Sequence, residues 1–288
     1  MARLIAYKAL LLSFMVSFIS CAQSPAGPVT YVLMVQGKAD NELYVDDVLA
    51  GHSFGENEDS VGYLLNPYLL QNGRHTLKLK VYPVAGAANG QAYMRLESSV
   101  NDGENKILAR HPFRIVENKP EEYTWEINID QLPYQLTGWS AGVDLRSEDS
   151  GALAKEVLAY YTRMHKMYES GGHADELISL AKKAEAEKTV YNYRDAKVQE
   201  TVDLLSKDGY NKKVKMEPIE DYKMVIYGNG KLVTLERNPV AEIAGYRKTG
   251  NFAHWSALIG HFDDGNGLYQ VPVLLYRPKA GAALERIR

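Results

Sequence analysis

From residue 31 to residue 143, short apolar runs alternate with polar positions and are separated by turn-forming residues. In the run 75–82, Leu77, Leu79 and Val81 share one face of an expected strand, and lysines occupy the other face. Strands of this length, joined by turns, are typical of an antiparallel β-sandwich. We expect further strands at residues 31–35, 43–45, 48–50, 93–97, 113–116 and 123–129.

From residue 144 the apolar spacing changes to three and four, which predicts helices. Ser150 is expected to be the N-cap of the first helix, and Gly171 to end it. Two further helices are expected at about 174–187 and 195–206.

The third expected helix carries its apolar residues at Val198, Val202 and Leu205. This spacing predicts that the three side chains face inward, and Gly209 is expected to end the helix.

After Pro218 the period returns to two, which predicts an antiparallel sheet built from hairpins. Residues 144–288 are therefore expected to form an α+β domain, in which helices precede the sheet. This order of elements is similar to the cone-shaped nuclear-transport-factor-2-like fold. The expected strands are 222–227 with 231–237 and 252–262 with 268–276.

The segment from Glu42 to Pro83, LYVDDVLAG followed by LLNPYLLQNGRHTLKLKVYP, resembles sugar-binding-like jelly-roll modules that accompany glycosidases. The resemblance implies a strand, a tight turn and a second strand, followed by a polar loop and a long strand. Such modules are often structural, so the resemblance supports the sandwich rather than a particular ligand.

The N-terminus has the pattern of a secretory signal peptide over residues 1–20. Arg3 and Lys8 precede an apolar run from Ala9 to Ile19, which is too short to span a bilayer as a helix. The Pro- and Gly-containing segment 21–30 is expected to be a tether.

The sequence Phe18-Ile19-Ser20-Cys21 resembles the lipobox of bacterial lipoproteins. The resemblance implies cleavage before Cys21, a diacylglycerol on its thiol and an acylated amine. Ala22 then implies sorting to the periplasmic face of the outer membrane. Phe18 and Ile19 depart from the usual Leu and Ala or Ser, so plain secretion and a buried N-terminal helix remain alternatives.

Charge and cysteine content exclude several classes of protein. The formal charge of −3 offers no basic face for nucleic acid. The single cysteine allows neither an internal disulfide nor a multi-thiolate metal site. Cleavage before Cys21 would leave 31 Lys and Arg against 36 Asp and Glu, a charge of −5.

The segment 138–142, Gly-Trp-Ser-Ala-Gly, matches the G-x-S-x-G elbow of serine hydrolases, with Ser140 as its nucleophile. The elbow needs a buried strand before it and a helix after it, and neither is expected here. His261 also precedes Asp263 and Asp264, which reverses the expected order of the triad. The sequence favours a glycine-rich junction.

His254 and His261, with Asp263 and Asp264, are candidate metal ligands. Seven residues apart on a regular strand, the two imidazoles would point to opposite faces. A catalytic zinc needs three convergent ligands. We therefore expect no metal and no cofactor, with His254 half-exposed in a strand and His261 at a hairpin end.

Tyrosine is abundant, with 20 residues, and aromatic side chains are enriched at recognition surfaces. Most are expected to pack in the interior. Tyr63 and Tyr68 in an expected polar loop, and Trp139 at the expected domain junction, are the candidate contact residues.

These observations favour a lipid-anchored envelope protein that binds a protein partner, a small ligand or a glycan without catalysis. A periplasmic immunity protein that neutralises a secreted antibacterial effector is the alternative. A serine hydrolase using Ser140 is the third and weakest candidate.

Overall fold

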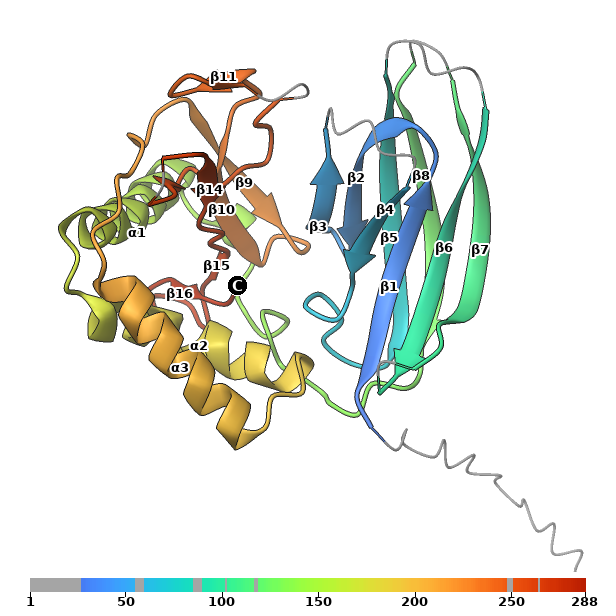
Figure 1. Ribbon diagram of the computed structural model, residues 1–288, viewed down its shortest axis with the longest axis horizontal. Coiled ribbons are helices and arrows are strands. Elements are labelled where there is room, and N and C mark those ends of the chain that lie inside the picture. Colours follow the sequence, from blue (N-terminus) through green and yellow to red (C-terminus); the bar gives the residue numbers. More distant parts are fainter. Residues whose placement is uncertain are drawn as a thin grey trace, which may run out of the picture.

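The computed structural model describes residues 27–54, 60–84, 90–101, 103–116, 119–247, 251–263 and 265–288. Residues 29–129 form a β-sandwich, here called the N-terminal sandwich. Residues 145–288, here called the C-terminal part, contain three α-helices followed by antiparallel strands. The two lie side by side, with β3 and β9 on their facing sides (Figure 1). The prediction of a sandwich followed by an α+β arrangement is confirmed.

The N-terminal sandwich consists of two four-stranded sheets, whose pairings in the described residues are all antiparallel. One sheet has the order β4-β1-β6-β7 and the other has the order β3-β2-β5-β8. The strands are β1 Val29–Gln36, β2 Ala39–Val45, β3 Val48–Ser53, β4 Ser60–Leu64, β5 Gly73–Pro83, β6 Gly90–Val100, β7 Lys106–Ile115 and β8 Glu121–Ile129.

The alternation along β5 determines which face of its sheet is buried. Leu77 and Leu79 are fully buried and Val81 is 2% exposed, as their spacing predicted. They join Tyr31 and Leu33 of β1 in the core between the two sheets. Lys78 and Lys80 therefore lie on the outer face, which is the face turned toward the C-terminal part.

The tight turn between β2 and β3 forms as the sequence predicted. Asp46 and Asp47 both have positive φ, 47° and 65°, which is the backbone of a two-residue hairpin turn. The Asp46 carboxylate accepts hydrogen bonds from the Thr76 backbone N–H at 2.8 Å and contacts the His75 ring at 2.6 Å. These contacts hold the hairpin against β5.

The three helices begin and end close to the expected residues. The N-cap of α1 is Asp149, whose side chain accepts from the Ala152 backbone N–H, and Ser150 is the first helical residue. The expectation of Ser150 as the cap was therefore wrong by one residue. Gly171 follows α1 with φ 66°, as predicted. The helices are α1 Ser150–Ser170, α2 Ala174–Tyr191 and α3 Ala196–Asn211.

The prediction for α3 was wrong in two respects. The helix continues through Gly209, and none of its residues is buried. Val198 and Leu205, expected to face inward, are 47% and 68% exposed. The reason is that α3 packs mainly on α2, through contacts such as that between Gln199 and Thr189, and reaches α1 only near its C-terminal end, where Tyr210 contacts Tyr168. Among the described residues, no further element covers its outer face.

The sheet of the C-terminal part has the order β16-β15-β10-β9. Its β9–β10 hairpin is confirmed, but the expected strand 252–262 is not, because only Ile259–His261 within it pair with β14. His254 has φ 62°, a conformation that no β-strand contains. The strands are β9 Tyr222–Tyr227, β10 Leu232–Arg237, β11 Glu242–Ile243, β12 Tyr246–Arg247, β13 Ile259–His261, β14 Leu268–Gln270, β15 Leu275–Tyr276 and β16 Glu285–Arg286.

A small hydrophobic cluster joins the N-terminal sandwich to the C-terminal part. Trp139, from the connection between them, is 5% exposed and lies at this junction. The other buried members are Tyr44 and Val48 of the sandwich and Tyr227, Leu232, Tyr276 and Ile287 of the C-terminal part.

Within the described residues, none of the helices has both the length and the apolar character needed to cross a bilayer.

Candidate functional site

A pocket of about 490 Å³ lies between the N-terminal sandwich and the C-terminal part. Residues of β3 and β4 form one wall, and residues of β10, the irregular segment 254–256 and the segment around β14 form the other. Its lining mixes aromatic, polar and charged side chains. Its lining residues include Tyr63, Tyr68, Glu236, His254, Trp255, Ser256, Gln270 and Arg288.

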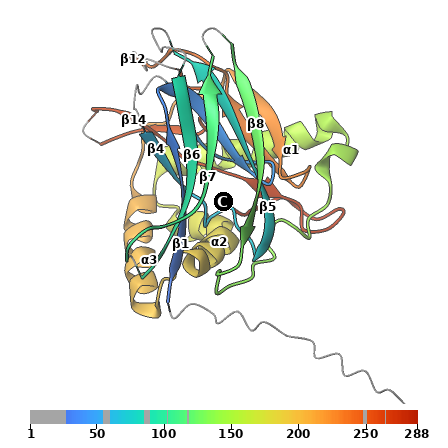
Figure 2. The same ribbon diagram turned by 90° about the vertical axis from the view of Figure 1, so that its right-hand side faces the viewer.

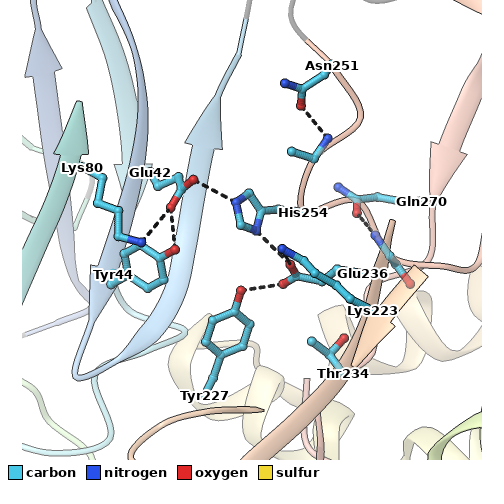
Figure 3. A network of polar contacts seen from close by, with 12 residues as sticks. Glu42, Tyr44, Lys80, Lys223, Tyr227, Thr234, Glu236, Asn251, His254 and Gln270 are labelled. Carbon is cyan, nitrogen blue, oxygen red and sulfur yellow. Dashed lines mark hydrogen bonds and ion pairs between the residues drawn. The ribbon is translucent and has the colours of Figure 1, made fainter. Parts of the chain in front are cut away.

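A buried carboxylate–imidazole–carboxylate cluster, drawn in Figure 3, adjoins this pocket. Two of its members, Glu236 and His254, line the pocket, and the third is Glu42. His254 Nε2 lies 2.9 Å from Glu42 Oε1, and His254 Nδ1 lies 2.8 Å from Glu236 Oε2. The side chains of Glu42, Glu236 and His254 are 7%, 4% and 10% exposed. Because Glu42 belongs to the sandwich and the other two to the C-terminal part, this clamp of three residues links the two parts.

Tyrosine hydroxyls and lysines complete the clamp. Tyr44 donates to Glu42 Oε2 at 2.5 Å, Tyr82 donates to Glu42 Oε1 at 2.9 Å, and Tyr227 donates to Glu236 Oε1 at 2.6 Å. Lys80 and Lys223 lie 3.5 Å and 4.0 Å from the respective carboxylates. Each buried oxygen of the two carboxylates thus has a partner, as buried charges require.

The strand register explains how the sequence builds the clamp. Glu42 and Tyr44 alternate with the buried Leu43, so both lie on the outer face of their sheet. Lys80 is the direct cross-strand neighbour of Glu42 on β5. On the opposite side, Glu236 is the cross-strand neighbour of Lys223 and forms a bridge with Ser256.

The cluster shifts the pKa values of its members in opposite directions. Burial alone would lower the pKa of His254, but its contacts with Glu236 and Glu42 outweigh burial and raise the pKa to about 9. Burial would raise the pKa of Glu42, but its contacts with His254 and Tyr44 lower the pKa to about 2. Burial and the Glu42 carboxylate both raise the pKa of Tyr44.

These shifts determine what chemistry the clamp can do. At neutral pH His254 is an imidazolium that donates from both ring nitrogens, and Glu42 is a carboxylate. An imidazolium whose two N–H groups are already donated has no lone pair with which to accept a proton. The clamp is therefore suited to holding the pocket walls together and to presenting fixed charge, and not to general base catalysis.

The rest of the pocket offers hydrogen-bonding groups beside aromatic rings. Gln270 accepts from the Ser256 backbone N–H at 2.8 Å, and Trp255 packs edge-on against Phe252 at 4.9 Å between ring centroids. Arg288 donates to the Pro67 carbonyl at 2.9 Å and to Glu187 at 2.7 Å. Its remaining nitrogen, Nη2, is buried without a hydrogen-bond partner among the described residues.

The three candidate contact residues lie in different surroundings. Tyr63 is not in a loop but in β4, where it is 7% exposed and donates to Asn41 at 2.6 Å. Its ring lies against Gly51, where even a Cβ would fall within 2.3 Å of the ring. Tyr68 is half-buried and lines the pocket together with Tyr63. Trp139 lies in the junction cluster, with its ring covered.

Ser140 lies in a turn, where its hydroxyl donates to the Thr137 carbonyl at 2.6 Å. β8 ends at Ile129, and the next regular element is a short 3-10 helix at Leu145–Ser147. The strand–turn–helix surroundings of a nucleophile elbow are therefore not found here.

The two candidate metal ligands His254 and His261 have separate partners. His254 is far less exposed than expected and belongs to the clamp, whereas His261 ends β13 and contacts Glu217 at 2.5 Å. Among the described residues, no group of three or more His, Cys, Asp or Glu side chains is arranged to hold a metal ion. Cys21, the expected signal peptide and most of the expected tether lie outside the described residues.

Sequence reasoning did not find the clamp. Glu42 and His254 are 212 positions apart, and Glu42 lies just before the expected strand 43–45. The one available signal was His254 itself, a histidine that precedes the acidic pair Asp263 and Asp264.

Comparison of the chain with protein-family models, with curated proteins and with solved structures finds no match in any of the three.

Proposed function

We propose that the chain is a lipid-tethered binding protein of the bacterial cell envelope, and that its ligand site is the pocket between its two parts. The observation that carries this proposal is the Glu42–His254–Glu236 clamp. The clamp joins both walls of a pocket of about 490 Å³, and both ring nitrogens of its imidazole are hydrogen-bonded to carboxylates. A fixed, partly aromatic pocket with convergent polar groups is the usual form of a small-molecule site.

The lining favours a small ligand with both hydroxyl groups and an apolar face, and a sugar has this chemistry. Trp255 and Tyr68 offer aromatic surfaces, on which the C–H face of a sugar ring packs. The side-chain amide of Gln270, whose oxygen accepts from Ser256, has N–H groups that can bond to ligand hydroxyls. We therefore expect a saccharide as the ligand.

The pocket is tested by thermal-shift measurements on the purified protein without residues 1–20, against mono- and oligosaccharides of bacterial envelopes. We expect at least one saccharide to raise the Tm by several degrees, because a ligand at 100 times its Kd adds about 2.7 kcal/mol of stability. If no saccharide raises the Tm at millimolar concentration, the proposal of a sugar site is wrong.

The lipid anchor is tested by mass spectrometry of the mature N-terminus. We expect a chain that begins at Cys21 and carries a diacylglycerol and an amide-linked acyl chain, since several acyl chains are needed for stable anchoring. The Cys21→Ser variant should leave the membrane fraction. A wild-type chain with an unmodified Cys21, or one cleaved elsewhere, contradicts the anchor.

A further inference from the structure

Large apolar side chains are exposed at one end of the molecule. Nine large hydrophobic residues are at least 37% exposed among the described residues, and five of them lie near Val29, where β1 begins. We call these five the tether end. They are Val100, Ile107, Leu108, Val190 and Val198.

The strand register places three of the five beside the start of β1. Val100 is the direct neighbour of Val29 in the β1–β6 pair. Ile107 pairs with Glu97, which lies three residues before Val100 on β6 and opposite Val32 of β1, and Leu108 follows Ile107. Val100, Ile107 and Leu108 are 37%, 56% and 38% exposed.

A hydrogen bond places the other two at the same end. The Tyr193 hydroxyl donates to the Val29 carbonyl at 2.8 Å, and Tyr193 lies in the turn between α2 and α3. Val190 and Val198, on either side of this turn, are 39% and 47% exposed. The start of β1 and the first turn of α3 both lie at the lower end of the molecule in each view (Figures 1 and 2).

The short segment between Cys21 and Val29 limits how far the tether end can lie from a lipid on Cys21. Cys21 is eight residues before Val29, and eight residues span at most about 28 Å. A lipid on Cys21 would thus keep the start of β1 within about 28 Å of the bilayer. This step rests on the anchoring part of the proposed function.

We propose that the tether end rests on the lipid surface, with its five apolar side chains in the interface between headgroups and acyl chains. Exposed apolar patches mark contact surfaces, and an interfacial contact buries such side chains about 5–10 Å deep. The exposed Lys106 and Lys197 directly precede Ile107 and Val198, so their ammonium groups can reach phosphate headgroups. Leu204 and Leu205, 65% and 68% exposed, extend the apolar surface along α3.

The test uses the acylated mature protein, which begins at Cys21, in vesicles of phosphatidylethanolamine and phosphatidylglycerol at a ratio of about 3:1, with or without brominated lipids as quenchers. Single tryptophans are added by Val198→Trp and Ile107→Trp, and the emission of the unsubstituted protein is subtracted. The control is Phe262→Trp, because Phe262 is 52% exposed and lies between β13 and β14. The β14 strand lies away from the lower end of the molecule in both views (Figures 1 and 2).

We expect brominated lipids to remove at least about half of the added emission at positions 198 and 107, because side chains at the depth of the interface lie close to the bromine atoms. We expect no loss of emission at position 262. Equal emission with and without bromine at 198 and 107 overturns the proposal. If Cys21 is found unacylated, its thiol, the single one in the chain, is coupled to a maleimide phospholipid and the same three variants are measured. This experiment tests whether the tether end contacts the membrane, independently of whether Cys21 is naturally acylated.

Discussion

Replacing His254 by alanine is expected to lower the free energy of unfolding by about 3–5 kcal/mol at pH 7, the cost of leaving a buried charge without its partner. The substitution removes the cation between two carboxylates that are 7% and 4% exposed. Lys80 and Lys223, at 3.5 Å and 4.0 Å, cannot replace its two short hydrogen bonds. Urea unfolding followed by circular dichroism measures the loss.

The matched control is His173→Ala. The His173 side chain is 43% exposed and lies 3.6 Å from Glu176, so its removal should change the free energy of unfolding by less than about 0.5 kcal/mol. If the two alanine variants are equally stable, the clamp does not hold the molecule together.

The same variant has a pH signature. The pKa of His254 is raised from 6.5 to about 9, so its contribution is complete below pH 6.5 and is lost as the pH rises through about 9. The pKa of Glu42 is lowered from 4.5 to about 2, so its contribution is present above pH 4.5 and is lost as the pH falls through about 2. The free energy of unfolding of the wild type should therefore fall between pH 6.5 and pH 9, and that of His254→Ala should fall much less. Urea unfolding at a series of pH values measures both.

Replacing Trp139 by alanine is expected to cost about 3–5 kcal/mol, the usual range for deleting a buried tryptophan. Its ring is 5% exposed between Tyr44 of the sandwich and Tyr227 of the C-terminal part. The Arg288 guanidinium lies 5.1 Å above the ring centroid, and Gly228 packs so closely that a Cβ would come within 3.2 Å of the indole nitrogen. The cavity left by alanine would thus lie between the two parts.

Calorimetry distinguishes this packing role from a surface contact. Trp139→Ala should lower the Tm more than Trp139→Phe, which keeps an aromatic ring in the cluster. If the free energy of unfolding of Trp139→Ala lies within about 1 kcal/mol of the wild-type value, Trp139 does not stabilise the junction and is a surface contact residue.

Much of the fold was predictable because its signals are local. The alternation along β5, the Asp46-Asp47 turn and the β9–β10 hairpin each depend on residues at most 15 positions apart. The helices were found for the same reason. Where the prediction failed, tertiary contacts determined the outcome.

Three failures share that cause. β4 exists because it pairs with β1, although its own sequence resembles a polar loop. The apolar stripe of α3 correctly predicted a helix, but periodicity could not tell whether another layer would cover it. The clamp joins Glu42 to His254 through the packing of two separately built parts, so neither residue carries a local signal of its role.

The most direct test of the account is whether the pocket between the two parts is the ligand site. Isothermal titration calorimetry at pH 7 with the saccharide that gives the largest thermal shift compares the wild type with Trp255→Ala and Trp125→Ala. Trp255 lines the pocket, whereas Trp125, also half-buried, packs against the sandwich core. The account predicts that Trp255→Ala weakens the Kd at least about 10-fold, or about 1.4 kcal/mol, and that Trp125→Ala leaves it unchanged. An equal Kd for all three proteins would contradict it.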